Sequence, residues 1–237
     1  MRARDVIEAF GEVADAERAR HAAGYFKTGK GEYGEGDVFL GATARQVYEV
    51  VRRYRDLPVS QVRVLLRSAI HEHRIGALLI LVSQFERGDE VVRGRIYRFY
   101  MDHLHRVNNW DLVDCSAHKI VGRHLREGKR STRVLDRLAR SRDLWRRRVA
   151  MIATHAYIRE REYEVPLRIA GVLLNDPHDL IHKAVGWMLR EVGKRDRAVM
   201  EGFLRRHYST MPRTMLRYAI ERLPEKRRNA YLKGTVR

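Results

Sequence analysis

The chain has 237 residues, 44% hydrophobic and 33% charged, which allows one large domain or two small ones and excludes a disordered chain. Lysine and arginine number 48 against 30 aspartate and glutamate residues, a net charge of +18. This excess favours a polyanionic partner (DNA, RNA or an anionic membrane surface) over a basic surface with no dedicated partner. The single cysteine, Cys115, excludes an intrachain disulfide and a cysteine-based zinc site.

The N-terminal residues 1–14 mix charges of both signs and contain no apolar core, so they do not predict a secretory signal. No stretch approaches the ~18 uncharged apolar residues of a membrane span. The longest apolar run, residues 75–82, predicts a buried segment of a helix.

Next in the chain comes a glycine-rich stretch, residues 24–41, without a helical pattern. Gly24 and Lys30 nearly fit the phosphate-binding loop of nucleotide-binding proteins. However, Gly31 stands where that loop needs a serine or threonine, and no strand precedes it. We therefore expect a mobile basic loop in which Lys27 can touch phosphate.

The rest of the chain shows a helical pattern, because apolar residues recur at three- and four-residue steps, as at Val47, Val50 and Val51. The prolines lie between such segments, where a helix would begin. No convincing alternation of period two is present. The sequence therefore predicts an all-α protein with about a dozen helices of roughly 10–18 residues.

Three segments resemble one another, since Asp111-Leu112, Asp143-Leu144 and Asp179-Leu180 each lead into a patch of small residues. A period of roughly 35 residues with two helices per period indicates a helical solenoid. We expect a single domain over residues 1–237 built from about six HEAT-like two-helix repeats. Its concave face would be basic and wide enough to bind a duplex.

Trp110 and Asp114 stand four residues apart, on one face of a helix that Asn109 would cap. Asp111 and Asp114 fall in the first turns, where the helix dipole favours anions. A basic protein has little electrostatic reason to hold a carboxylate toward a polyanion unless the carboxylate does chemistry there. Alone the pair is a weak signal, because tryptophan is usually core and such an aspartate is usually a cap.

Two further clusters follow. Arg146, Arg147 and Arg148 are consecutive, so they point ~100° apart on a helix, and only one can face the concave side while the others reach phosphate or solvent. Arg146 fits the solvated face best. Lys183 and Trp187 share one helix face, for which a core tryptophan beside a solvated lysine is the simpler interpretation.

In their order and spacing, three stretches resemble the AlkD family of alkylpurine DNA glycosylases, which are stacks of HEAT-like repeats. The stretches are Trp-Asp-Leu-Val-Asp, Trp-Arg-Arg-Arg-Val-Ala and Lys-Ala-Val-Gly-Trp-Met-Leu-Arg-Glu. The resemblance implies that Asp114 is the catalytic aspartate. It also implies that Trp110 and Trp187 are the two site tryptophans, that Arg148 is the site arginine and that Tyr25 lines the same cleft. The chain departs from the family in a longer glycine-rich insertion and an arginine-rich region at 123–148, and neither departure removes a site residue.

The implied function is repair of alkylated DNA by a monofunctional glycosylase, a hydrolase that releases purines of the 3-methyladenine and 7-methylguanine type from duplex DNA. The resemblance further implies recognition through the DNA backbone, without insertion of the base into a pocket, and no metal or organic cofactor. We expect a monomer in the cytoplasm, associated with the nucleoid when bound to DNA. Further DNA contacts are expected from Tyr25, Lys27, Arg147, Lys183 and Arg190.

Two other functions stay open. A non-catalytic HEAT-like module could bind DNA or RNA by charge alone, although it would have no need for an anion in a cationic groove. A scaffold for an acidic protein would instead spread its charge over the convex face as well. A metal site at His71 and His73 is not expected, because residues two apart point away from each other on a helix.

Overall fold

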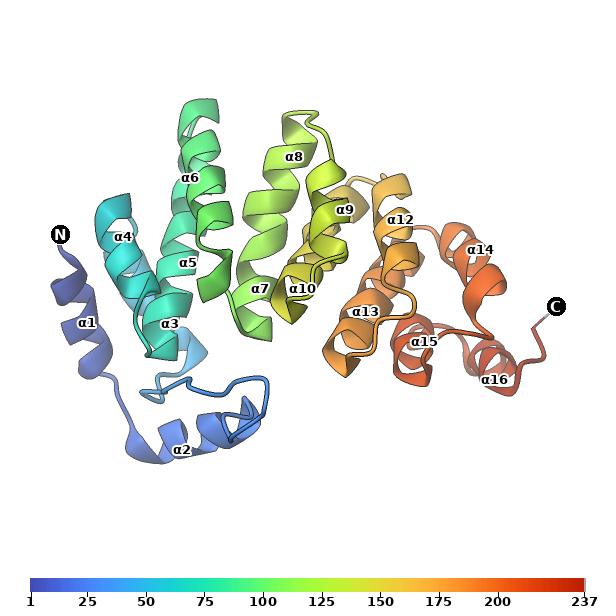
Figure 1. Cartoon of the computed structure of the whole chain (residues 1–237), viewed down its shortest axis with the longest axis horizontal. Coiled ribbons are helices and arrows are strands. Elements are labelled where there is room, and N and C mark those ends of the chain that lie inside the picture. The colour runs from blue at the N-terminus through green and yellow to red at the C-terminus, as the bar shows by residue number, and fades with distance from the viewer. Residues whose placement is uncertain (237) are drawn as a thin grey trace. The chain divides into compact units, whose positions relative to one another are not determined.

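The computed structural model describes residues 1–236 and confirms the all-α prediction (Figure 1). In the part of the chain that it describes, extended pairing is limited to one isolated bridge, between Val38 and Ile70. None of the described helices is long and apolar enough to cross a membrane.

The helices follow one another with short connections, apart from the segment 26–43. Their bounds are α1 Ala3–Gly11, α2 Ala16–Tyr25, α3 Ala44–Arg53, α4 Val59–Leu66, α5 His71–Arg87, α6 Glu90–Asp102, the 3-10 turn η1 Leu104–Arg106, α7 Trp110–Ala117, the π-helical turn η2 His118–Gly122, α8 Arg123–Glu127, α9 Arg133–Ala139, α10 Leu144–Ala153, α11 His155–Arg159, α12 Glu164–Val172, α13 Asp179–Arg195, α14 Arg197–His207, α15 Arg213–Ile220 and α16 Glu225–Lys233.

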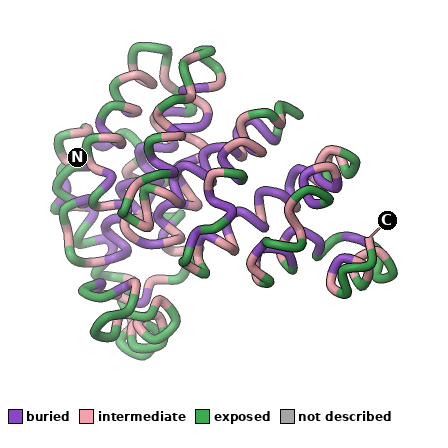
Figure 2. Tube along the Cα trace, turned by 45° about the vertical axis from the view of Figure 1, so that its right-hand side comes forward, coloured by how far each residue is buried: buried purple, intermediate pink, exposed green. Residues whose placement is uncertain are grey.

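The chain divides into two compact units, the first covering Met1–Ser116 and the second beginning at Ala117. In each unit the buried residues run along the inner sides of the helices, while the outer turns are exposed (Figure 2). Each unit therefore has its own core. The predictions of a single domain over 1–237, of about six repeats and of a basic concave face stay predictions.

Helix α5 is the centre of the first unit and contains the predicted apolar run. Residues 77–82 are all buried, because α1, α3, α4 and α6 all pack against α5. Gly76 lies directly against the ring of Phe10 from α1, and a side chain at this position would come within 2.8 Å of that ring. A helix buried on all sides in this way needs apolar residues at every position rather than on one stripe.

Helix α13 is the centre of the second unit, and its main neighbour is α15. The contact is close because Gly186 faces α15, where a Cβ atom would lie 2.5 Å from the Met215 carbonyl oxygen. The repeated Asp-Leu pairs mark helix starts as the sequence predicts. Asp143 caps α10 by accepting hydrogen bonds from the amides of Trp145 and Arg146, and Asp179 is the first residue of α13.

The expected helix lengths of 10–18 residues are wrong for several elements, because long helical stretches are interrupted. Between α10 and α11, the buried hydroxyl of Thr154 donates a hydrogen bond to the Met151 carbonyl, which competes with the backbone ladder. After α7 the backbone widens into the π-helical turn η2. There Gly122 lies so close to α10 that a Cβ atom would meet the Ala153 carbonyl oxygen at 2.1 Å.

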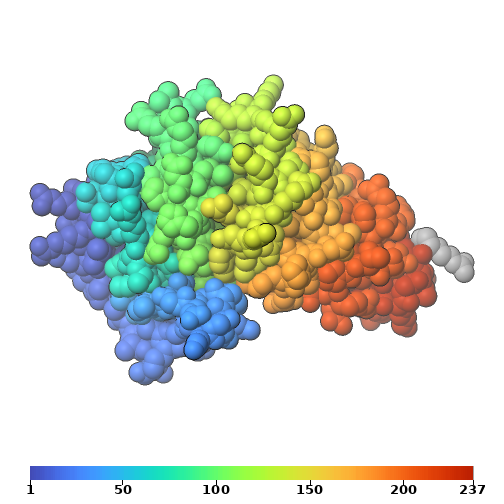
Figure 3. All heavy atoms as spheres, viewed as in Figure 1, coloured from blue at the N-terminus to red at the C-terminus, as the bar shows by residue number. Residues whose placement is uncertain are grey.

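The glycine-rich segment after α2 is folded into hydrogen-bonded turns. The Gly34 amide donates to the Lys27 carbonyl at 3.0 Å, and Lys27 itself adopts a positive φ of 53°. The far end of the segment is attached to α5, because the His71 amide donates to the Val38 carbonyl at 2.8 Å. In Figure 3 the atoms of α2 and this segment appear in blue at the lower edge of the first unit.

Candidate functional site

The residues expected to do chemistry divide between the two units. Trp110 and Asp114 belong to the first unit, whereas Arg148 and Trp187 belong to the second. Their assembly into one site therefore stays a prediction, and each half is described by itself.

Trp110 and Asp114 lie on α7, whose start is fixed by Asn109. The Asn109 carbonyl accepts the first bond of the helix from the Val113 amide at 3.2 Å, and its side-chain oxygen accepts from the Trp110 amide at 2.8 Å. Both side chains are half-buried. The helix thus presents an aromatic face and, one turn later, a carboxylate on the same side.

Trp110 is part of a cluster of aromatic rings from α2 and the following segment. Its ring is stacked on Phe26, with centroids 5.1 Å apart and planes 14° apart, and Tyr25 meets its edge at 6.0 Å. The ring of His71 also belongs to this cluster. Phe39 is stacked on it, with ring centroids 4.5 Å apart. The structure thus brings Tyr25 and Trp110 together, and Tyr25 remains 62% exposed.

A buried network of charged groups lies behind this cluster. The His71 ring donates from Nδ1 to Asp37 at 3.0 Å and from Nε2 to Asp111 at 2.7 Å. Asp37 also accepts hydrogen bonds from Arg74 and, at 3.1 Å, from the side-chain amide of Asn109. The second nitrogen of the Arg74 fork donates to the side-chain oxygen of the neighbouring asparagine, Asn108.

The network shifts the pKa values of its members. Burial alone would lower the pKa of His71, but the hydrogen bonds to Asp111 and Asp37 outweigh burial and raise the pKa to about 9. Burial alone would raise the pKa of Asp37, but the bonds from His71 and Asn109 and the charge of Arg74 hold that pKa below its usual range. His71 is therefore an imidazolium at neutral pH.

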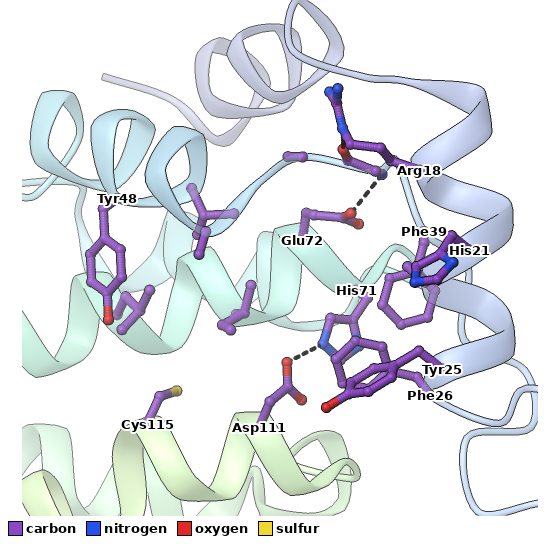
Figure 4. A pocket seen from close by; sticks show the side chains of 17 residues that line it. Arg18, His21, Tyr25, Phe26, Phe39, Tyr48, His71, Glu72, Asp111 and Cys115 are labelled. Atoms are coloured by element: carbon purple, nitrogen blue, oxygen red, sulfur yellow. Dashed lines mark hydrogen bonds and ion pairs between the residues drawn. The ribbon is translucent and has the colours of Figure 1, made fainter.

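A cavity of about 550 Å³ opens beside the network, between α2, α3, α5 and α7 (Figure 4). Its walls are mostly apolar and aromatic, with Phe26 and Phe39 at one end and Tyr48 at the other. Asp111 and Cys115 reach its floor from α7. Cys115 is half-buried, and its thiol donates to the Leu112 carbonyl at 3.4 Å.

In the second unit, Arg148 is buried on α10 and reaches α13. Its guanidinium donates to the carbonyl of Leu180 at 2.6 Å, which ties the first turn of α13 to α10. Arg146 is exposed, in line with the solvated position expected for it. Arg148 is therefore the member of the arginine run that faces inward.

Trp187 is half-buried on α13, with the ring of His155 as its aromatic neighbour at 6.3 Å. His155 lies in turn 5.2 Å from His118 of the π-helical turn. Burial lowers the pKa of His155, so this ring is neutral at pH 7. Its Nε2 atom is buried and has no hydrogen-bond partner.

Of the residues expected to touch DNA, Tyr25 and Lys27 are exposed. The other three form ion pairs within the second unit. Arg147 binds Asp176 at 2.6 Å, Lys183 binds Asp179 at 2.7 Å, and Arg190 binds Glu221. A phosphate would have to compete with these carboxylates, so DNA contacts from the three cations stay a prediction.

The network around His71 is not predicted by the sequence patterns described above. His71 and His73 have different partners, since His73 binds Ser68 at 3.0 Å whereas His71 binds Asp37 and Asp111. In residues 1–236 no group of three or more His, Cys, Asp or Glu side chains could hold a metal ion. The one signal for the network in the sequence is Asp111. Asn109 already stands at the start of α7, so the helix does not need a second capping residue there.

The chain was compared with known families, curated proteins and solved structures. A family model described as DNA alkylation repair enzyme matches residues 6–223. No curated protein matches the chain. A solved structure from Enterococcus faecalis, described as a predicted DNA alkylation repair enzyme, is similar with a TM-score of 0.69 and 16% identity, over 90% of this chain and 97% of that chain.

Proposed function

The chain belongs to the DNA alkylation repair enzyme family, and on that premise we propose that it is a monofunctional DNA glycosylase. It hydrolyses the N-glycosidic bond of alkylated purines, of the 3-methyladenine and 7-methylguanine type, in duplex DNA. The alternative is a non-catalytic helical-repeat protein that binds DNA or RNA by charge.

One observation carries the proposal: a half-buried carboxylate, Asp114, stands one helical turn after a half-buried tryptophan in a protein with a net charge of +18. Binding a polyanion gains nothing from an anion in the binding face. Cleaving a glycosidic bond does gain from it, because the sugar becomes cationic as the bond breaks.

The reaction follows from the charge of the substrate. Alkylation of a purine ring nitrogen makes the base cationic, so the electron pair of the bond between C1′ and the base nitrogen leaves with the base and neutralises it. The sugar is left as an oxocarbenium ion, which Asp114 stabilises electrostatically. A water molecule oriented by Asp114 adds to C1′ and loses a proton to solvent. No general acid is required, because the leaving base is already charged.

The tryptophans stabilise the same developing positive charge. The faces of Trp110 and Trp187 would pack against the deoxyribose and the cationic base, and each contributes ~0.5–2 kcal/mol when the contact is desolvated. Arg148 would hold a phosphate next to the lesion after turning from its buried position against the Leu180 carbonyl, with Tyr25 and Lys27 on the flanking backbone. Arg147, Lys183 and Arg190 would bind phosphate in exchange for their present carboxylate partners.

The test is release of 7-methylguanine and 3-methyladenine from methylated duplex DNA, with wild-type protein and Asp114→Asn. We expect release by the wild type, and a rate about 100-fold or more lower for the variant, because a catalytic electrostatic group of this kind contributes on that order. Duplex binding should be unchanged or tighter, since a negative charge has been removed.

A matched control is Asp102→Asn, which removes a carboxylate from the exposed end of α6. It should leave both release and binding as in the wild type. Release by Asp114→Asn at the wild-type rate would mean that the catalytic carboxylate is another residue. No release by either protein, with tight salt-dependent binding, would favour the non-catalytic alternative.

A further inference from the structure

The position of His71 between two carboxylates favours its doubly protonated form, although Arg74 Nη2 also lies 3.4 Å from Nδ1. A neutral imidazole has one N–H group and one lone pair, so it can donate to only one carboxylate. Both ring nitrogens of His71 face a carboxylate oxygen within 3.0 Å, and the side chain is 4% exposed. The buried ring therefore needs its second proton, because without it one carboxylate would be left facing a lone pair.

The four groups that bond to one another around the ring, Asp37, Asp111, Arg74 and His71, carry no net charge when His71 is an imidazolium. Asp37 from the segment after α2 and Asp111 from α7 are negative, and Arg74 on α5 is positive. Arg106, from the turn η1, adds a positive charge near Asp37 and Arg74. The other nearby acid, Glu72, points to the amides of Leu40 and Gly41 instead of the ring.

The network connects the segment 26–41 to the start of α7. Asp37 belongs to the segment and Asp111 is the residue after Trp110, and His71 bridges the two. The same segment supplies Phe26, which stacks on Trp110 at 5.1 Å and contacts the His71 ring at 5.1 Å. Loss of the bridge would free both the backbone next to Trp110 and the ring on which Trp110 is stacked.

The bridge also affects the charge at Asp114. Asp111 stands three residues before Asp114, so the two carboxylates are neighbours on the surface of α7. The imidazolium neutralises Asp111 at 2.7 Å. A bare Asp111 would repel the ionised form of Asp114 and would itself attract the cation that Asp114 should stabilise.

We propose that His71 is a positioning residue for the glycosylase site, holding Trp110 and Asp114 in place as an imidazolium shared by Asp37 and Asp111. This inference rests on the proposed function. It predicts that Trp110 and Asp114 are held in place at neutral pH and become mobile when His71 loses its second proton. The pH dependence of the reaction would then be set by a residue that touches neither DNA nor the reacting atoms.

The first experiment is single-turnover release of 3-methyladenine from methylated duplex DNA between pH 7 and 10, with spontaneous release subtracted. Wild-type protein should lose about tenfold in rate through a midpoint near pH 9, as Trp110 and Asp111 are released. In His71→Gln the side-chain NH2 group can face only one of the two carboxylates and the carbonyl oxygen cannot donate to the other, so this variant should already be about tenfold slower at pH 7 and show no midpoint.

The matched control is His73→Gln, on the same helix and equally buried, whose side chain binds Ser68 rather than the segment or α7. It should keep the wild-type midpoint. Asp111→Asn gives a second readout, because it keeps the acceptor for His71 but removes one negative charge. The midpoint should then fall by about one pH unit or more. A role in packing alone would not move it, so this variant decides the matter if His71→Gln fails to fold.

A third readout does not depend on activity. Intrinsic tryptophan fluorescence of the free protein should titrate near pH 9 in the wild type and not in His71→Gln, because Trp110 is stacked on a ring that the bridge holds. Identical pH profiles of wild type, His71→Gln and Asp111→Asn in both release and fluorescence would overturn the inference while leaving the glycosylase in place. No release by the wild type at any pH would overturn the proposed function, and with it the catalytic half of the inference. The fluorescence titration would then still decide the bridge itself.

Discussion

The surroundings of Trp110 and Trp187 differ in kind. Trp110 lies on rings and a backbone that are fixed by a closed set of buried charges, centred on His71. Trp187 follows Gly186, and its helix is fixed by close backbone packing against α15. The first unit therefore fixes its candidate tryptophan, Trp110, through charged groups, and the second fixes Trp187 through close packing. Conditions that change charge should act on the first unit, and changes in side-chain volume should act on the second.

The largest effect should come from removing a charge inside the network. Arg74 is 1% exposed and binds both Asp37 and Asn108. Arg74→Met should lower the free energy of unfolding by about 3–5 kcal/mol, because it removes one of the two cations that pair with the buried carboxylate of Asp37. Urea denaturation measures this. In the control Arg87→Met, which breaks a half-exposed pair with Asp56, the loss should stay below about 1 kcal/mol. Equal losses of stability in the two variants would contradict the conclusion that the buried charges around His71 hold the first unit together.

The second effect is a loss of stability at high pH. His71 binds its proton more tightly in the folded protein, where the pKa is about 9, than in the unfolded chain, where it is near 6.5. Its contribution is therefore complete below about pH 6.5 and is lost as pH rises through about 9, a change of up to about 3 kcal/mol. Denaturation curves from pH 6 to 10 should show this fall in the wild type. The same fall in His71→Gln would assign it to other groups.

The third effect tests shape in the second unit. Gly186→Ala should lower the free energy of unfolding by about 1–3 kcal/mol, because the new methyl group meets the backbone of α15. Gly202→Ala, in the same unit, is the matched control. No atom lies within 4 Å of the added Cβ there, so stability should rise by about 0.5–1 kcal/mol from helix propensity. Neither change should depend on pH between 7 and 10, in contrast to the first unit.

The smallest effect concerns the ring of Trp187 itself. Trp187→Phe keeps an aromatic face beside His155 but offers a weaker π-surface to a cation. We expect release of 3-methyladenine to slow about three- to tenfold with little change in melting temperature. A fall in melting temperature at an unchanged rate of release would instead make Trp187 a core residue.

Much of this arrangement could be predicted from the sequence, because it depends on neighbours in the chain. The apolar run 75–82 predicts a helix buried on all sides, and the Asp-Leu pairs mark the starts of α10 and α13. Asn109 stands at the start of α7 as expected, because its carbonyl accepts the first bond of the helix, from the Val113 amide.

The network around His71 could not be predicted in the same way. Asp37 and Asp111 lie 34 and 40 residues from His71, and no local pattern links residues so far apart. Asp37 stands in a glycine-rich segment whose path depends on positive φ angles at Gly36 and Gly41. The burial of Arg148 could not be predicted from its neighbours in the sequence either, since it depends on the carbonyl of Leu180 in a later helix.

Helix α2 carries Tyr25 but contributes no fully buried residue to the core. It is attached at its beginning, where the Asp15 amide donates to Leu40 at 2.8 Å and Arg18 donates to Gly41 at 2.7 Å, and at its end by the aromatic cluster. A helix held at its two ends opens at a lower free energy than the core, so its amides should exchange with solvent long before those of α5. In kinetic terms, we expect α2 to detach and return many times during one lifetime of the folded protein. This element could therefore admit a wide ligand to the cavity beneath it without unfolding the rest of the chain.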